Sequence, residues 1–298
     1  MRGLRVSTAT VGAVLVILST GMMAAADGIA KLFAGQYAAP QLFALSAGLV
    51  VAFSVFGARA SGERLTITSR GPMIWRAGLT VLASVAFYMA FRLLPFADVF
   101  LFVALIPLIA AVLSGPVLNE VPRPSAWAAL ALGAGGVICM LPGGVTGLAA
   151  GHLWALVAAL SGTGALLAAR VIGLRERAPM AQVFWPNLAL LVVMACALPF
   201  VWRPMGLVDV VWVAVYALAL FGARYVVAEA MRLLPAYVAT PLMNLQFVWM
   251  VTIGFVFFGE VPGIGTVLGA ALVVGSGGWL VVEDHIGRLR AARMVPAE

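Results

Sequence analysis

The sequence predicts an all-α, polytopic membrane protein whose ten transmembrane helices form two inverted repeats of five helices each. Three observations carry this prediction. Of the 298 residues, 64% are hydrophobic and only 10% are charged, which is far from the balance of a soluble domain. Ten apolar segments follow one another along the chain, each close to the length that crosses a bilayer as a helix. A long stretch of the chain also occurs twice.

The duplication is clearest in Ala90 to Pro122 and Ala230 to Pro262, whose matching residues keep one constant spacing. Each stretch opens with Ala-x-Arg-Leu-Leu-Pro, continues through an apolar run and closes on Glu-Val-Pro. Pro95 and Pro235 suit the first turn of a helix, where the missing N–H breaks no bond. The same residues also suit an ordinary helix-turn-helix connection, a reading that leaves the duplication intact. A run of about 22 residues crosses roughly 30 Å as a helix, so the repeated unit belongs in a membrane.

The ten helices are assigned in order from the length of each apolar segment. The N-terminal segment imitates a secretory signal, because Arg2 and Arg5 precede an apolar run that ends in three alanines at 24–26. Its fit to the repeat favours an uncleaved first helix instead. The predicted helices cover residues 9–31, 40–58, 73–93, 96–118, 126–142, 151–172, 180–202, 209–231, 236–258 and 264–283.

An odd number of crossings per repeat inserts the second copy upside down relative to the first. Ser19 matches Ser161, and Gly135 matches Gly275, so the correspondence extends beyond the duplicated hairpin. Inverted repeats recur in secondary transporters, which bind substrate between the copies near the middle of the membrane. The predicted domains are a first repeat at 1–145, a second at 146–287 and a cytoplasmic tail at 288–298.

The basic residues predict the orientation of the chain. Most of the 18 lysines and arginines fall in connections that share one side, whereas Lys31, Arg92 and Arg203 lie on the other. Because lysine and arginine are enriched in cytoplasmic loops, both termini are expected in the cytoplasm. This distribution accounts for the net charge of +7 without nucleic acid as a partner.

The sequence gives no sign of an enzyme, a cofactor or a bound metal. His152 and His285 are the only histidines and lie near helix ends, so no cluster of acid, base or metal ligands is expected. Cys139 and Cys196 are expected as buried free thiols. No Gly-x-x-x-x-Gly-Lys-Ser/Thr motif or attached domain is present, so gradients must drive any transport. An intramembrane enzyme and a channel are the less favoured alternatives.

Polar side chains inside the apolar segments are the candidate substrate ligands, because they are costly in lipid unless they face protein or water. Arg224 is the leading candidate, because its guanidinium could bind a substrate carboxylate. Alternatively, its side chain could snorkel to the cytoplasmic face or link two helices. Asn244 and Gln246 lie about 200° apart on their helix, which favours Asn244 for the cavity and Gln246 for contacts between helices. The further candidates are the aromatic residues Tyr88, Tyr225 and Trp249 and the hydroxyl residues Ser19, Ser161 and Thr163.

Two local ion pairs are expected from helical spacing. Asp27 and Lys31 lie four residues apart, and Glu229 and Arg232 three apart, so each pair shares one helix face. Asp27 is alternatively a candidate proton site.

The chain resembles the drug/metabolite transporter superfamily, in particular its EamA-type bacterial members, over roughly residues 8 to 285. Ile106-Pro107-Leu108 is similar to the family's proline in the fourth helix, whereas Gln246-Phe247-Val248 in the second copy departs from it. The other motifs of the resemblance are Leu94-Pro95, Leu234-Pro235, Leu118-Asn119-Glu120-Val121-Pro122 and Phe258-Gly259-Glu260-Val261-Pro262.

The resemblance implies a basket of two halves in the bacterial inner membrane, with helices 1, 3, 4, 6, 8 and 9 around a central cavity. It also implies a carrier of small metabolites, with amino acids favoured as substrates and export as the direction; a drug or another metabolite is the alternative. Alternating access would open the cavity to each side in turn, with Pro95, Pro107 and Pro235 as kinks. The expected partners are a small-molecule substrate and the lipid bilayer, and the chain would act as a monomer or a homodimer.

Overall fold

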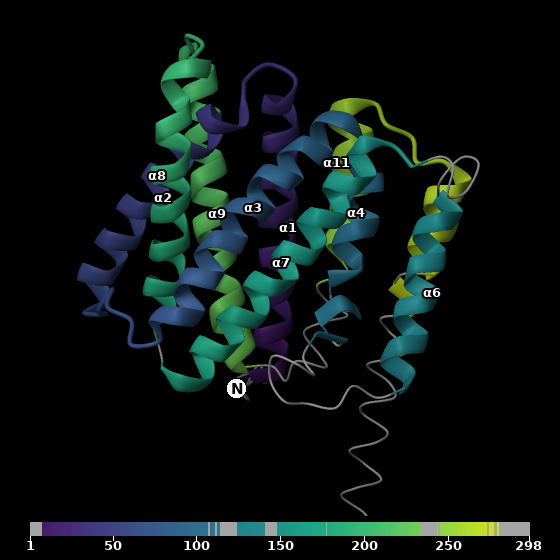
Figure 1. Ribbon diagram of the computed structural model, residues 1–298, viewed down its shortest axis with the longest axis horizontal. Coiled ribbons are helices and arrows are strands. Elements are labelled where there is room, and N and C mark those ends of the chain that lie inside the picture. The colour runs from purple at the N-terminus through teal and green to yellow at the C-terminus, as the bar shows by residue number, and fades with distance from the viewer. Residues whose placement is uncertain are drawn as a thin grey trace, which may run out of the picture.

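The computed structural model is helical throughout its regular structure, within the residues that it describes (Figure 1). Six helices are long and apolar enough to cross a membrane, so the chain is a multi-pass membrane protein. They are α1 (Thr8–Ala34), α2 (Ala39–Ser61), α3 (Arg70–Leu93), α7 (Ala150–Arg175), α8 (Pro179–Val201) and α9 (Leu207–Leu233). The described residues are 8–106, 108–110, 112–113, 124–140, 148–176, 178–233, 243, 245–272, 274–276 and 279.

Shorter helices complete the described part of the chain. They are α4 (Phe96–Ala104), α6 (Pro124–Met140), α11 (Gln246–Phe258) and an apolar helical segment at Ile264–Ser276. Each lies inside one of the predicted segments or within two residues of it. The count of ten crossings stays a prediction, because the predicted helices at 96–118, 236–258 and 264–283 are described only in part. Pro107, Pro235 and Asn244 lie outside the described residues.

Local sequence fixes several helix ends. Leu94 is extended, with φ −128° and ψ 155°, because a residue before proline avoids the helical region. Pro95 therefore separates α3 from α4, which begins at Phe96 rather than at the proline itself. Gly62 ends α2 with φ +70°, and Gly259 ends α11 with φ +64°, a conformation that favours glycine.

The long helices pack in pairs that join the first half of the chain to the second. α3 lies along α7, α1 along α9, and α2 along α8. Glycines allow close approach: a Cβ on Gly164 would lie 2.8 Å from a methyl group of Leu79, and one on Gly222 would overlap Met22. The apolar core accordingly lies between the two halves.

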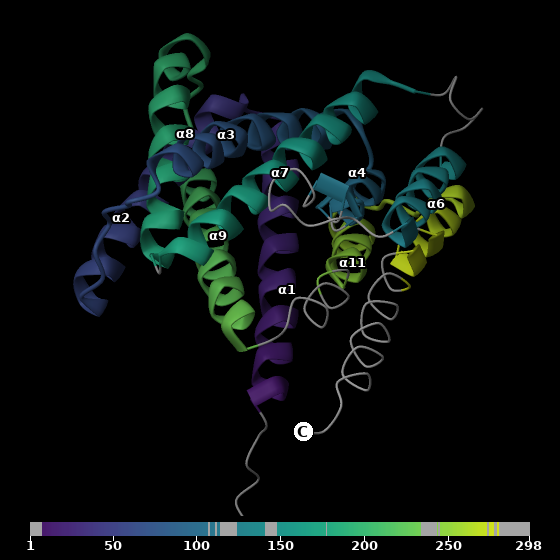
Figure 2. The ribbon, with the colours of Figure 1, turned by 60° about the horizontal axis from the view of Figure 1, so that its bottom comes forward.

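The helix ends define two opposite ends of the bundle. The Lys31 end is the one where α1, α3, α8 and α11 finish and where α2, α4, α7 and α9 start (Figure 2). Gln41 and Arg203 hold it together, with Gln41 Nε2 donating to the Arg203 carbonyl at 2.6 Å. At the other end, called the Glu176 end, the Glu176 carboxylate accepts from the amides of Thr68 and Ser69 at 2.9 and 2.7 Å.

The helix α6 lies to one side of the bundle, next to the segment Ile264–Ser276 (Figures 1 and 2). A Cβ on Gly269 would approach the Gly136 carbonyl oxygen to 2.5 Å, so the two backbones touch there. These glycines therefore serve packing within one chain.

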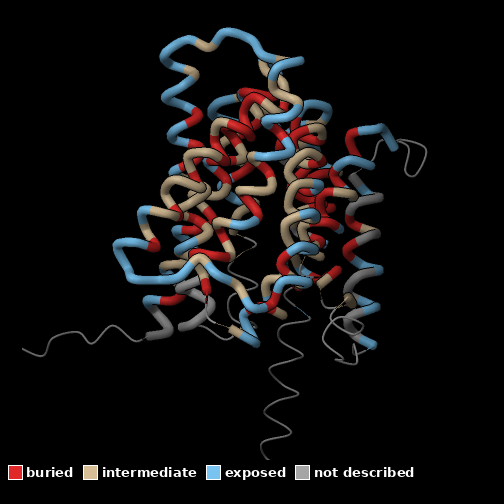
Figure 3. The backbone as a smooth tube through the Cα atoms, turned by 60° about the vertical axis from the view of Figure 1, so that its left-hand side comes forward, coloured by how far each residue is buried: buried red, intermediate tan, exposed pale blue. Residues whose placement is uncertain are grey.

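Many large apolar side chains of the bundle are exposed, and exposed positions recur along the outer helices (Figure 3). Phe200 is 88% exposed and Leu207 is 82% exposed, as expected of side chains that face lipid. Cys139 and Cys196 are free thiols, as predicted, but both are exposed rather than buried. The expectation of burial is wrong because an apolar residue in a membrane helix faces lipid as readily as protein.

Candidate functional site

Polar side chains lie on α1, α9 and α11 within the apolar bundle. Gln246 on α11 donates from Nε2 to Oδ2 of Asp27 on α1, at 3.0 Å. This bond confirms the expected role of Gln246 in linking helices. The expected pair of Asp27 with Lys31 is wrong: Lys31 instead pairs with Glu260, because helix packing brings partners closer than local spacing does.

Arg224 lies on α9 and is half-buried in the apolar bundle. Among the described residues it forms no hydrogen bond or ion pair. Its electrostatic neighbours are Arg76, which adds to the positive charge, and the uncharged phenol of Tyr216. An arginine in this setting has unused donors and a charge to neutralise.

Tyr216 connects the two charges of this region. It is buried on α9 and lies within electrostatic range of Asp27, Tyr88 and Arg224. Sequence reasoning missed Tyr216, although a phenol in the middle of an apolar segment is the kind of signal that singled out Tyr88. The candidate site is therefore Asp27, Gln246, Tyr216 and Arg224.

Arg76 is a second residue that sequence reasoning counted only as a loop charge. It lies inside α3, where its guanidinium donates to the carbonyl of Ala165 at 3.2 Å and to that of Gln182 at 3.3 and 3.4 Å. These bonds join α3 to α7 and α8 near the Glu176 end. Arg76 thus has acceptors for its donors, but no carboxylate neutralises it within the described residues.

Tyr88 is 1% exposed, and its hydroxyl donates to the Tyr37 carbonyl at 2.7 Å. Its ring lies edge-on to Phe43, with centroids 5.5 Å apart. In this conformation Tyr88 ties α3 to the connection between α1 and α2. Its contact with substrate stays a prediction.

The other aromatic candidates are partly exposed. Trp249 is 41% exposed, and its indole lies 3.6 Å from where a Cβ on Gly21 would sit, between α1 and α11. Tyr225 is 39% exposed and stacks on Phe221. Contact of either residue with substrate stays a prediction.

The three hydroxyl candidates bond to their own helices. Ser19 donates to the Val16 carbonyl at 2.7 Å, and Thr163 to that of Ala159 at 2.7 Å. Ser161 does the same with Val157 at 2.5 Å. Buried hydroxyls with such partners permit close packing of helices.

A shallow pocket of about 150 Å³ opens at the Lys31 end, separate from the candidate site. Tyr37 and Asp209 lie in its wall, with the Tyr37 hydroxyl donating to Asp209 at 2.6 Å. This bond raises the pKa of Tyr37, because the phenol proton is held by the carboxylate. The remaining lining residues are Leu32, Phe33, Gln36, Val208 and Trp212.

Comparison with known proteins agrees with this architecture. One solved crystal structure is 21% identical and aligns over 94% of this chain and 98% of its own, with a TM-score of 0.65, which shows a shared fold. No curated protein matches the chain. The model of the EamA-like transporter family matches residues 149–281. This confirms the resemblance over the second half of the chain, where residues 149–281 match the EamA-like transporter family.

Proposed function

We propose that the protein is a secondary transporter that moves small metabolites, with amino acids favoured, across the inner membrane. Ten helices in two inverted repeats would alternate access to a central site, with net export. The Glu176 end and both termini would face the cytoplasm. The runner-up is a carrier of the same fold for a drug or another metabolite.

The pairing of helices supports the inverted repeat. Under the sequence correspondence, α1 matches α7, α2 matches α8, and α3 matches α9. A two-fold relation would then turn the contact of α3 with α7 into that of α9 with α1, and would leave the contact of α2 with α8 unchanged. All three contacts are present. Rocking of one repeat on the other is the usual mechanism of such a design.

The observation that carries the substrate class is a pair of opposite charges on facing helices. Asp27 on α1 and Arg224 on α9 both lie within electrostatic range of Tyr216 but are not paired with each other. An amino acid presents a carboxylate for the arginine and an ammonium for the aspartate. A cationic drug would need Asp27 but not Arg224.

Counterflow in proteoliposomes tests transport directly. Uptake of labelled amino acids against a preloaded pool should saturate with concentration. Uptake that rises linearly without limit would instead indicate a channel.

Replacement of Arg224 tests the site. Arg224→Met should lower the uptake of carboxylate-bearing substrates by roughly 10-fold or more, since a hydrogen bond to a charged group contributes about 1.5–3 kcal/mol. Arg64→Gln is the matched control, because it removes an exposed loop charge that is far from the site. Equal uptake by Arg224→Met and the parent, at equal folded yield, would assign Arg224 to helix packing or topology.

A further inference from the structure

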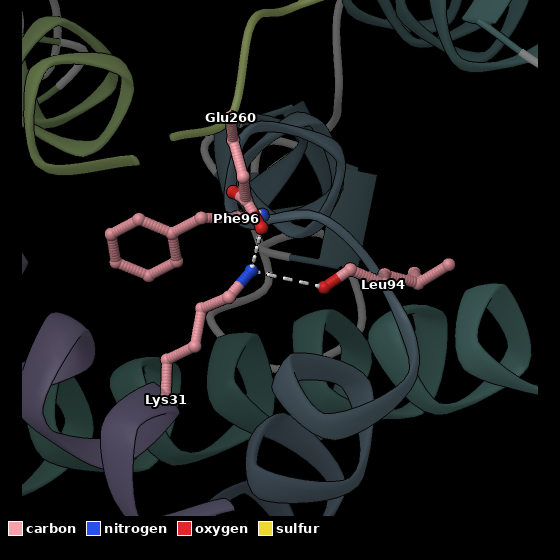
Figure 4. Close-up of polar contacts among 4 residues, drawn as sticks. All are labelled: Lys31, Leu94, Phe96 and Glu260. Carbon is pink, nitrogen blue, oxygen red and sulfur yellow. Dashed lines mark hydrogen bonds and ion pairs between the residues drawn. The ribbon is translucent and has the colours of Figure 1, made fainter. Parts of the chain in front are cut away.

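Lys31 is a charged side chain held almost out of solvent at the C-terminal end of α1. Its side chain is only 10% exposed. The ammonium pairs with Oε1 of Glu260 and donates to the Leu94 carbonyl at 3.3 Å (Figure 4). The rings of Phe96 and Phe258 flank it, with centroids 5.6 and 5.2 Å away. A carboxylate, a carbonyl oxygen and two aromatic rings therefore enclose the Lys31 ammonium.

Glu260 joins that enclosure to a second helix. Its other oxygen, Oε2, accepts from the amide of Phe96, the first residue of α4, at 2.8 Å. A carboxylate at a helix N-terminus is stabilised by the unpaired amides and the helix dipole. Glu260 comes from the second half of the chain, whereas Lys31, Leu94 and Phe96 come from the first. The cluster thus connects the two halves.

The cluster lies at one end of the interface between α1 and α11. Along that interface Gly21 faces Trp249, and Gly28 faces Ile253 at 3.0 Å from an added Cβ. Ala24 lies between these glycines on the same helix face and is 0% exposed. Lys31 continues this face by one more turn, so its ion pair closes the interface at the Lys31 end.

The position of α7 that matches Lys31 carries no cation. The spacing that matches Ser19 to Ser161 places Gly173 opposite Lys31. Gly173 is exposed, and an added Cβ there would meet nothing within 4 Å. Among the described residues, the enclosure of Lys31 therefore has no counterpart at the matching position of the second repeat.

We propose that Lys31 and Glu260 form a latch that holds the Lys31 end of the transport pathway closed, and that they must separate when this end opens. The inference rests on the proposed alternating access and adds the residues that control one gate. Separation of two partly buried charges is unfavourable unless water reaches both. Opening of the interface supplies that water, so the pair breaks together with the opening rather than before it.

Thiol accessibility tests the latch without any substrate. Cys139→Ser and Cys196→Ser first remove the two exposed thiols. Ala24→Cys then reports on the interface beside the latch, and Ala181→Cys, at an equally buried position on α8, reports on the Glu176 end. A charged, water-soluble thiol reagent is applied to the purified protein in detergent, and the rate of modification is measured.

The latch predicts a local change in that rate. Lys31→Met should speed modification at Ala24→Cys by roughly fivefold or more and leave Ala181→Cys unchanged, since loss of the latch shifts the population toward the open end. Glu260→Gln should act in the same direction while keeping an oxygen for the Phe96 amide. Lys31→Arg should stay near the parent rate. Arg92→Met, which removes an exposed charge from the same end, is the control and should have no effect.

Two outcomes would overturn the proposal. Equal rates at Ala24→Cys in Lys31→Met and the parent would mean that the pair does not hold the interface closed. Equal acceleration at Ala24→Cys and Ala181→Cys would mean general loosening, and the pair would then serve only stability. A failure of counterflow would reject the transport proposal, but it would not alter the modification rates at Ala24→Cys and Ala181→Cys that test the latch.

Discussion

Single polar residues in the bundle find their partners on other helices. Gln246 and Asp27 lie 219 residues apart in sequence, yet their side chains are hydrogen-bonded. We expect Gln246→Leu to destabilise the fold by about 1 kcal/mol, because it removes the partner of a carboxylate inside the membrane. Thermal unfolding in detergent measures the change.

A matched control for Gln246→Leu lies on the same helix. Thr252→Val replaces an exposed hydroxyl that bonds only to its own Val248 carbonyl, so the unfolding midpoint should hardly move. Equal unfolding midpoints for Gln246→Leu and the parent would show that the hydrogen bond to Asp27 does not stabilise the fold.

The sequence identified charged residues but not their partners. Arg224 and Asp27 stand out because charge is rare in apolar segments. Spacing alone predicts partners within one helix, which is why Asp27 was expected beside Lys31. The true partner of Lys31 is 229 residues away, so only the packed bundle reveals it. Tyr216 and Arg76 were missed although each is a polar side chain inside a helix, a signal that the sequence does carry.

The positions of the helices were easier to predict from the sequence than the contacts between them. The predicted segment 40–58 lies within Ala39–Ser61, and 180–202 nearly coincides with Pro179–Val201. Apolar length fixes these helices because lipid sets a minimum span.

The close approach of two helices at Gly269 and Gly136 can be tested by substitution. Gly269→Ala would place a methyl group 2.5 Å from the Gly136 carbonyl oxygen and force the two helices apart. We expect a loss of about 1–3 kcal/mol, as for other overpacked interfaces, measured by thermal unfolding. Gly275→Ala, in the same helical segment, meets nothing within 4 Å and is the control. A larger loss for Gly275→Ala would contradict this packing.

The contact between the α2–α3 connection and the end of α7 is predicted to depend on pH. The amides of Thr68 and Ser69 donate to Glu176 and hold its pKa below the ordinary 4.5. A carboxylate with a lowered pKa stabilises the folded state above its unfolded pKa, and the effect is lost as the pH falls through the folded pKa. Hydrogen exchange should therefore show these two amides protected at pH 7 and less protected in acid.

Glu176→Gln separates this effect from general acid unfolding. The variant should show weaker protection of the two amides at pH 7 and a smaller change in acid. The amide of Gln41, which bonds to the Ala38 carbonyl at the Lys31 end, should be unaffected. Unchanged protection of Thr68 and Ser69 in Glu176→Gln would show that the carboxylate charge does not hold the connection.

For the whole molecule, the two ends differ in charge as well as in structure. Exposed arginines gather near the Glu176 end, whereas Lys31 at the other end is enclosed by an ion pair. The positive-inside rule therefore predicts that the Glu176 end faces the cytoplasm. The positions of the basic residues in the sequence suggested this orientation. The packing of the helices now shows which connections lie at the same end of the bundle.

Cysteine labelling in intact cells tests that orientation. In a background with Cys139→Ser and Cys196→Ser, Gln36→Cys probes the Lys31 end and Thr66→Cys probes the Glu176 end; both positions are exposed in connections between helices. An impermeant thiol reagent should modify Gln36→Cys directly and Thr66→Cys only after the membrane is permeabilised. Labelling of both from outside would contradict the packed bundle, since α2 alone separates the two positions. The reverse pattern would keep the bundle and invert the orientation, which would also place the Lys31 latch on the cytoplasmic side.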